Sequence, residues 1–147
     1  MTTGPLQIER LDGGALWRVT LGGSKGNILD AALTEALAAV VAEASHSPSL
    51  KALCLEGAGA HFSFGASVQE HLPGQVEGML RRFHGLISAL LDSSVITLAA
   101  VRGQCLGGGL ELVTTCHRIF AGRDAKLGQP EIALGVFAPV GSVLLAE

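Results

Sequence analysis

The stretch V-R-G-Q-C-L-G-G-G-L-E-L, residues Val101–Leu112, decides the fold class and carries the strongest functional signal. It follows an apolar, β-rich run (residues 95–101), and it places three consecutive glycines before a carboxylate, Glu111, where a helix is expected to begin. Glycine loses the most backbone freedom on folding, so such a run is costly unless the backbone must approach something closely. A helix N-terminus presents N–H groups to an anion or a developing oxyanion. We therefore predict that residues 107–109 open a helix whose first turn polarises a carbonyl oxygen, with Glu111 beside it for proton transfer.

Segments typical of strands and helices alternate on both sides of this stretch. Apolar runs predict strands over residues 6–11, 15–21, 51–56, 95–101 and 118–121, and Asp12-Gly13-Gly14 predicts a hairpin between the first two. Helical spacing predicts one helix from the cap residue Asp30 to about Ser45 and another over residues 75–91. This order predicts one α/β domain over residues 1–147, with largely parallel central strands.

The composition limits the classes of function. With 147 residues, 48% of them apolar, the chain suits one globular domain with a real core. Its net charge of −3 is scattered, so no basic patch indicates nucleic acid or an anionic membrane, and no apolar run predicts a membrane span. Cys54, Cys105 and Cys116 are odd in number and lack metal-type spacing, so we expect reduced core thiols, no metal site and a cytoplasmic location.

Three segments are expected to form one site. In the glycine-rich loop of residues 57–68, Gly65 lets the backbone turn so that the N–H of Ala66 can point into a cleft. The second segment holds Gly108 and Glu111, and the third, G-Q-P-E at residues 128–131, holds a second carboxylate, Glu131. Two N–H donors from different loops are the usual construction of an oxyanion hole. Two nearby carboxylates supply an acid and a base when their environments separate their pKa values.

At these residues the chain resembles the crotonase (enoyl-CoA hydratase/isomerase) superfamily. The likeness runs in order through G-N-I-L (26–29), H-F-S-F-G-A-S-V (61–68), L-G-G-G-L-E-L (106–112) and K-L-G-Q-P-E-I (126–132), and it covers essentially the whole chain. The resemblance implies a crotonase-like spiral of ββα units and a coenzyme A thioester as substrate. It implies no separate cofactor, because coenzyme A is part of the substrate, and it implies a homotrimer or a dimer of trimers for a full-length form.

The resemblance also implies roles for individual residues. It places the oxyanion hole on the N–H groups of Ala66 and Gly108, and it makes Glu111 the base that activates water and Glu131 the proton donor. It implies that the substrate and its coenzyme A moiety contact Lys25, Gly26, Asn27, Ala66, Ser67, Val68, Gln69 and Gly108. Ser67 stands where most hydratases of the family carry an aspartate, which weakens the substrate assignment more than the reaction class.

A narrower likeness extends over residues 61–73, 101–111 and 134–139. These segments resemble the branch of the family that hydrates cyclic dienoyl-CoA thioesters in aromatic degradation. This resemblance implies a 1,4 addition, in which the hydroxyl joins the carbon β to the thioester and the proton goes to the far end of the dienolate. Two roles remain open for the neighbouring apolar side chains, which either shape a ring-sized pocket or pack in the core: Phe62, Phe64, Val136 and Phe137.

Two alternatives compete with an active hydratase. Residues 139–147 look like the first turns of a helix, so we expect a truncated N-terminal core without the C-terminal helical part. Such a product would be an inactive fragment that acts only in oligomer contacts. The second alternative is a serine hydrolase, because G-G-S-K-G at residues 22–26 matches a nucleophile elbow, with Ser24 assisted by Asp92 or Asp124 and by His117. His61, His84 and His117 fit no metal spacing, and we expect surface or cap roles for them.

Overall fold

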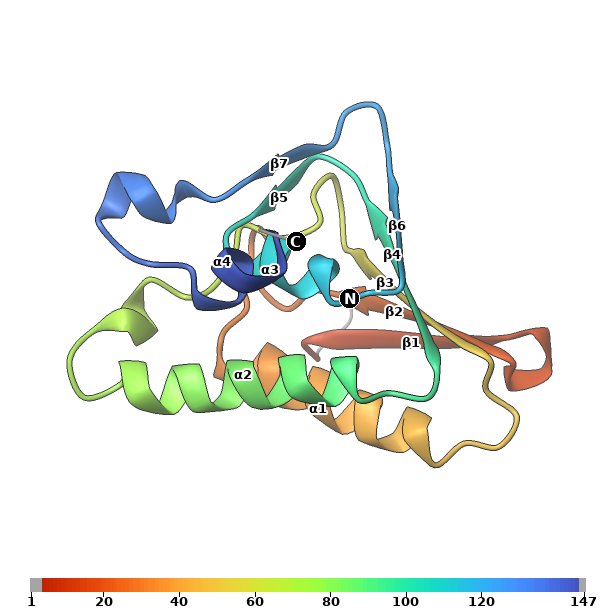
Figure 1. Cartoon of the computed structure of the whole chain (residues 1–147). Coiled ribbons are helices and arrows are strands. Elements are labelled where there is room, and N and C mark those ends of the chain that lie inside the picture. The colour runs from red at the N-terminus through yellow and green to blue at the C-terminus, as the bar shows by residue number, and fades with distance from the viewer. Residues whose placement is uncertain (1–3, 146–147) are drawn as a thin grey trace.

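A five-stranded sheet supports the rest of the molecule in the computed structural model, which describes residues 4–145 (Figure 1). Its strand order is β1-β2-β3-β4-β6. The bounds are β1 (Leu6–Leu11), β2 (Leu16–Leu21), β3 (Ala52–Gly57), β4 (Ile96–Val101) and β6 (Arg118–Ala121). The first two strands form an antiparallel hairpin around the short helix η1 (Asp12–Gly14), and every other neighbouring pair is parallel. The predicted α/β class and the largely parallel centre of the sheet are confirmed.

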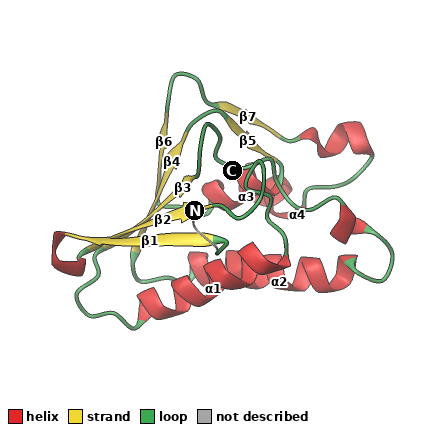
Figure 2. Ribbon diagram, turned by 180° about the vertical axis from the view of Figure 1, so that it is seen from behind, coloured by secondary structure: helices red, strands yellow, loops and turns green. Residues whose placement is uncertain are grey.

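Two long helices, α1 (Ala31–Ser45) and α2 (Val76–Leu91), pack side by side against one face of this sheet (Figures 1 and 2). The carboxylate of Asp30 caps α1 by accepting a hydrogen bond from the N–H of Leu33 at 2.9 Å, as predicted. The inward stripes of both helices are buried against the strands, so the main core lies between the helices and the sheet. That core includes Val19, Leu37, Val41, Leu53, Leu55, Leu86 and Leu90.

A second, smaller sheet lies away from the two long helices (Figure 1). Its strands, β5 (Gln104–Leu106) and β7 (Lys126–Gly128), pair in parallel, and the sequence pattern predicts neither of them. Three residues are too few to show a periodic pattern. Strand β5 leads into α3 (Gly108–Thr114), and β7 leads into the short helix η3 (Pro130–Leu134). Because the two strands are paired, the segments that follow them start from the same edge.

The remaining elements are the short helix η2 (Gln69–His71) and α4 (Pro139–Leu144). Helix α4 packs on α3, and the predicted helix after residue 138 is present over Pro139–Leu144, with Leu145 as its C-cap. Residues 146 and 147 of that prediction lie outside the described residues. Among residues 4–145, no helix has the length and apolar character needed to cross a membrane.

Candidate active site

Two main-chain amides from separate loops lie close together at the start of α3. Gly65 has φ +99°, and a Cβ at this position would lie 2.8 Å from the carbonyl oxygen of Leu106 and 3.4 Å from the nitrogen of Gly108. A Cβ on Gly108 would in turn lie 3.2 Å from the nitrogen of Ala66. Within residues 4–145, neither the Ala66 N–H nor the Gly108 N–H donates a hydrogen bond. The structure therefore brings together two main-chain N–H groups without an acceptor, and the sequence predicts these same two groups to share one site.

Hydrogen bonds from Asn27 fix the loop that carries Ala66. Asn27 has φ +50° and is 3% exposed. Its amide nitrogen lies 3.0 Å from each of three loop carbonyls, those of Ala58, His61 and Phe62. The hydroxyl of Ser63 donates to the Asn27 carbonyl at 2.8 Å and accepts from the N–H of Gly65 at 3.0 Å. The Asn27 side chain thus stabilises the loop, so its amide group is already bonded within the protein.

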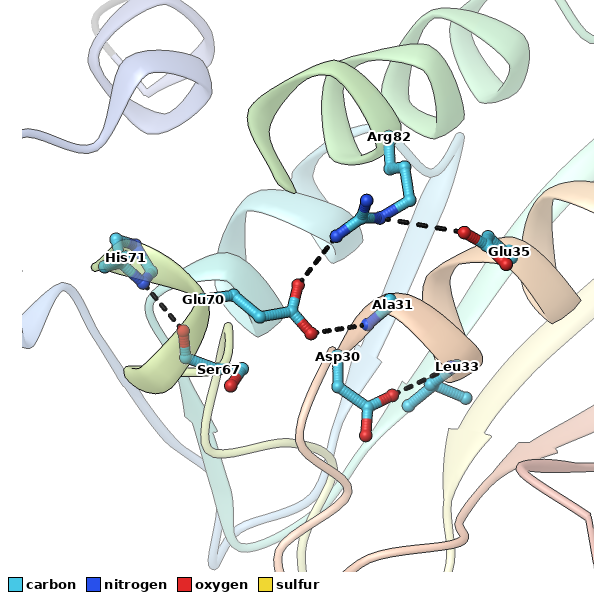
Figure 3. Close-up of polar contacts among 8 residues, drawn as sticks. All are labelled: Asp30, Ala31, Leu33, Glu35, Ser67, Glu70, His71 and Arg82. Carbon is cyan, nitrogen blue, oxygen red and sulfur yellow. Dashed lines mark hydrogen bonds and ion pairs between the residues drawn. The ribbon is translucent and has the colours of Figure 1, made fainter. Parts of the chain in front are cut away.

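The segment after Ala66 is tied to both long helices through Glu70 (Figure 3). One carboxylate oxygen of Glu70 accepts from the N–H of Ala31 at 2.9 Å, and the other accepts from Arg82 at 3.0 Å. Arg82 also lies 3.8 Å from the carboxylate of Glu35 on α1. These contacts join η2, the N-terminus of α1 and one face of α2, and they restrain the loop that positions the Ala66 N–H.

Glu111 lies in the first turn of α3 and is 5% exposed. Its Oε1 accepts a hydrogen bond from the N–H of Gly141 in α4 at 2.8 Å. Burial raises the pKa of Glu111 above the usual range of a glutamate, and the charge of Glu131 raises it further. The N–H groups of Gly141 and Val140 and the nearby imidazole of His84 lower this pKa, but the net shift is upward.

Glu131 lies in η3, which follows β7 of the small sheet, and its carboxylate reaches the start of α3. Its Oε1 lies against Gly107, where an added Cβ would collide with the carboxylate. Gly107 also has φ +50°, so glycine is required here for both space and backbone conformation. The Oε2 of Glu131 is buried and has no hydrogen-bond partner among the described residues.

One cavity of about 270 Å³ contains all four of the groups described above. Ala66, Gly108, Glu111 and Glu131 line it together, and the remaining wall comes from η2, α2 and the chain before and at the start of α4: His71, Val76, Met79, Leu80, Phe83, His84, Val136, Phe137, Ala138 and Pro139. Most of these wall residues are apolar, which is typical of a small-molecule site with a few convergent polar groups.

The sequence predicts only part of this wall. Val136 and Phe137 line the cavity, but Phe62 is fully buried in the core and Phe64 packs its ring edge-on against His61. The apolar residues of α2 on the wall carry no signal beyond an ordinary core stripe. The expectation of a surface or cap role for His84 is wrong, because His84 faces the cavity with both glutamates. No short motif marks that position.

The residues expected to contact coenzyme A divide between two hollows and the surface. Lys25, Gly26 and Asn27 line a second hollow of about 530 Å³, formed with residues 22–24 and 58–61. Ala66 and Gly108 line the cavity with the glutamates, whereas Ser67, Val68 and Gln69 line neither of these two hollows. Val68 is 71% exposed, so this segment is accessible from solvent.

The groups of the serine-hydrolase alternative have other partners. The Ser24 hydroxyl accepts from the N–H of Ile28 at 2.9 Å, and the His117 ring bonds to Thr97 at 2.8 Å. Asp124 accepts from the N–H of Gly103 at 3.0 Å, and Asp92 is the C-cap of α2. Within residues 4–145, no hydrogen bond joins these side chains into a triad.

The family profile and the similar proteins all point to one family. The profile of the enoyl-CoA hydratase/isomerase family matches residues 13–146. The chain is 50% identical over 141 residues to the cyclohexa-1,5-dienecarbonyl-CoA hydratase of Thauera aromatica, which covers 96% of this chain and 55% of that protein. It is 32% identical over 122 residues to a probable enoyl-CoA hydratase of Bacillus subtilis, covering 80% of this chain and 47% of that protein.

Solved structures show the same fold. Pseudomonas aeruginosa DspI superposes with a TM-score of 0.90 and 28% identity, over 99% of this chain and 56% of that one. An enoyl-CoA hydratase/isomerase from Marinobacter aquaeolei superposes with a TM-score of 0.87 and 25% identity, over 97% of this chain and 58% of that one. The chain thus spans about half the length of the relatives it matches. By its sequence and its crotonase-type fold, this chain belongs to the enoyl-CoA hydratase/isomerase family.

Proposed function

We propose that the protein is an acyl-CoA hydratase that adds water to a conjugated coenzyme A thioester. The observation that carries this proposal is that two glutamates line the same cavity as two main-chain N–H groups without an acceptor among the described residues. Family membership supports it, since the relatives at 50% and 32% identity are described as hydratases.

The proposed reaction begins with the thioester carbonyl oxygen between the N–H groups of Ala66 and Gly108. As water adds to the β carbon, negative charge moves onto this oxygen and an enolate forms. Fixed donors stabilise that charge in the transition state, and loss of one such donor typically costs about 3 kcal/mol of barrier.

The two glutamates move the protons. Glu111 takes a proton from water while the water oxygen bonds to the β carbon, and Glu131 delivers its own proton to the enolate carbon. The proton left on Glu111 then passes to Glu131 through solvent, which restores both groups for the next turnover. The upward shift in the pKa of Glu111 makes its carboxylate a stronger base than a solvated glutamate. The net result is addition of one water across the conjugated system, with no change in oxidation state.

For the acyl group we propose a cyclic diene. The relative from Thauera aromatica is named for such a substrate, and the cavity wall here is largely apolar. Addition in the 1,4 sense then sends the proton from Glu131 to the far end of the dienolate. The nucleotide end of coenzyme A would extend toward Lys25 and residues 67–69, and a full-length form would assemble as a homotrimer or a dimer of trimers.

A side-by-side hydration assay tests the proposal. The purified chain is incubated with cyclohexa-1,5-dienecarbonyl-CoA and with crotonyl-CoA, and products are followed by mass spectrometry. We expect Glu111→Gln and Glu131→Gln each to lower hydration by about a hundredfold or more while thioester affinity by calorimetry stays similar. Glu43→Gln is the matched control, because this glutamate is exposed and its side chain pairs with Arg10.

Each other result has a definite meaning. Full activity in either cavity variant refutes the role of that glutamate. Tight thioester binding without turnover by the unmodified chain supports the inactive fragment. Stoichiometric labelling by a serine-directed phosphonate that Ser24→Ala prevents would support the hydrolase instead.

A further inference from the structure

We propose that His84 is a positioning residue of this site, whose Nε2 holds the water that Glu111 activates. This inference rests on the proposed function, and it adds a third polar side chain to the two glutamates. His84 lies on α2, whereas the glutamates lie on α3 and η3. The three side chains thus come from separate elements and line one cavity.

The geometry of His84 is unusual for a histidine on a packed helix. Its Nε2 is buried and has no hydrogen-bond partner among the described residues. Its neighbours on the cavity wall, Leu80 and Phe83, are apolar and offer no partner. Buried polar atoms are almost always satisfied by protein, water or ligand. His84 also lines a hollow of about 290 Å³ between α2 and α4. We place the partner of its Nε2 in the cavity that His84 shares with both glutamates.

A second unsatisfied atom faces the same space. Glu131 Oε2 is also buried without a partner among the described residues, and Glu111 keeps its Oε1 on the Gly141 N–H. Glu111 must be ionised to activate water, and an ionised carboxylate only accepts hydrogen bonds, so it can take a proton of a water molecule but cannot fix the water oxygen. The proton of Glu131 is needed at the enolate carbon. A His84 Nε2–H group supplies that missing donor and leaves one lone pair of the water for attack on the β carbon.

The charges around His84 agree with this assignment. The groups that face it in the cavity are Glu111 from α3, Glu131 from η3 and His71 from η2. His71 is already engaged, since its Nδ1 lies 2.7 Å from the Ser67 carbonyl oxygen. On α2 itself, Arg81 pairs with the exposed carboxylate of Glu77. Arg82 pairs with the mostly buried carboxylate of Glu70 and lies near that of Glu35. The electrostatic effect of His84 favours the ionised form of Glu111, which is the form that activates water.

Three variants of the whole chain test the inference. His84→Leu removes the donor, His84→Gln keeps an N–H donor at a similar distance from the backbone, and His46→Gln is the control because His46 is exposed at the end of α1. Hydration kinetics are measured with both thioesters across pH. Separately, the titration of the Glu111 carboxyl is followed by carbon NMR without any thioester, and thermal unfolding verifies that each variant is folded.

We expect His84→Leu to lower kcat by about ten- to a hundredfold with KM changed less than about twofold, because water rather than thioester is misplaced. His84→Gln should recover much of that loss, and the Glu111 titration midpoint should move upward in His84→Leu but not in His46→Gln. An unmoved midpoint, or a His84→Gln as impaired as His84→Leu, overturns the inference. An unmodified chain that hydrates neither thioester refutes the proposed function instead, and the NMR midpoint still decides whether His84 acts on Glu111.

Discussion

At the scale of one residue, Glu111 couples the chemistry of the site to the stability of the fold. Its pKa is raised in the folded protein, chiefly by burial, so between the unfolded and folded pKa values the folded state binds more protons. The free energy of unfolding should therefore fall as pH rises through that window. We expect Glu111→Gln to be more stable than the unmodified chain at neutral pH and to show a flatter pH dependence, because the amide can still accept from Gly141.

Urea unfolding between pH 4 and pH 8 measures this difference. The exposed Glu43→Gln variant should keep the pH dependence of the unmodified chain. A Glu111→Gln protein that loses stability at neutral pH would contradict the claim that burying this carboxylate is costly.

The second prediction for a single residue concerns a side chain added at Gly107. Its φ of +50° and the adjacent Glu131 carboxylate leave no room for a side chain. We expect Gly107→Ala to destabilise the fold by about 1–3 kcal/mol and to displace Glu131, so that hydration is lost with stability. Gly85→Ala on α2 is the opposite control, since its added Cβ meets nothing within 4 Å and should stabilise the helix by about 0.5–1 kcal/mol.

At the scale of elements, the site depends on how η2 is attached to the two long helices (Figure 3). Glu70 joins the N-terminus of α1 to Arg82 of α2, and its side chain is only 17% exposed. We expect Glu70→Leu to cost about 1–3 kcal/mol, because it leaves the Ala31 N–H without its acceptor and Arg82 without its closest partner. Residues 66–72 should then exchange amide hydrogens faster by mass spectrometry.

The control for the contacts of Glu70 is an exposed carboxylate of α2. Glu77 forms an exposed pair with Arg81, and such pairs are worth about 0.3–0.5 kcal/mol. Equal exchange rates in Glu70→Leu and Glu77→Leu would show that the buried contact does not restrain the loop.

The elements also show what the sequence could predict and why the rest was missed. The two long helices and the central strands were predicted because each contains a full periodic stripe, and Asp30 marked the start of α1. Strands β5 and β7 exist only through their mutual pairing, so neither has a pattern of its own. The glutamates were found because glycine and proline punctuate their motifs. His84 was misjudged because its place on the cavity wall depends on how α2 packs against α3 and α4.

At the scale of the whole molecule, the described surface retains a large amount of exposed apolar side chain. The two edge strands of the main sheet, β1 and β6, differ in the side chains that they expose. On β1, charged residues form ion pairs with their neighbours, namely Glu9 with Arg18 and Arg10 with Glu43. On β6, by contrast, Ile119 and Phe120 are 42% and 63% exposed, and Leu127 of β7, the next strand along the chain, is 52% exposed. An apolar edge strand of this kind favours association, whereas charged edges oppose it.

We therefore expect the chain to self-associate as its concentration rises, through the surface that includes β6. Phe120→Lys should weaken this association by at least about tenfold, because burying an unpaired ammonium in an interface is costly. Leu91→Lys is the matched control, since Leu91 is 53% exposed at the end of α2 and lines a hollow with residues of α4. Sedimentation velocity over a hundredfold range of concentration measures both variants. Equal sedimentation of Phe120→Lys and the unmodified chain would place the contact elsewhere, and a monomer at every concentration would show that the exposed edge has no partner in a second copy.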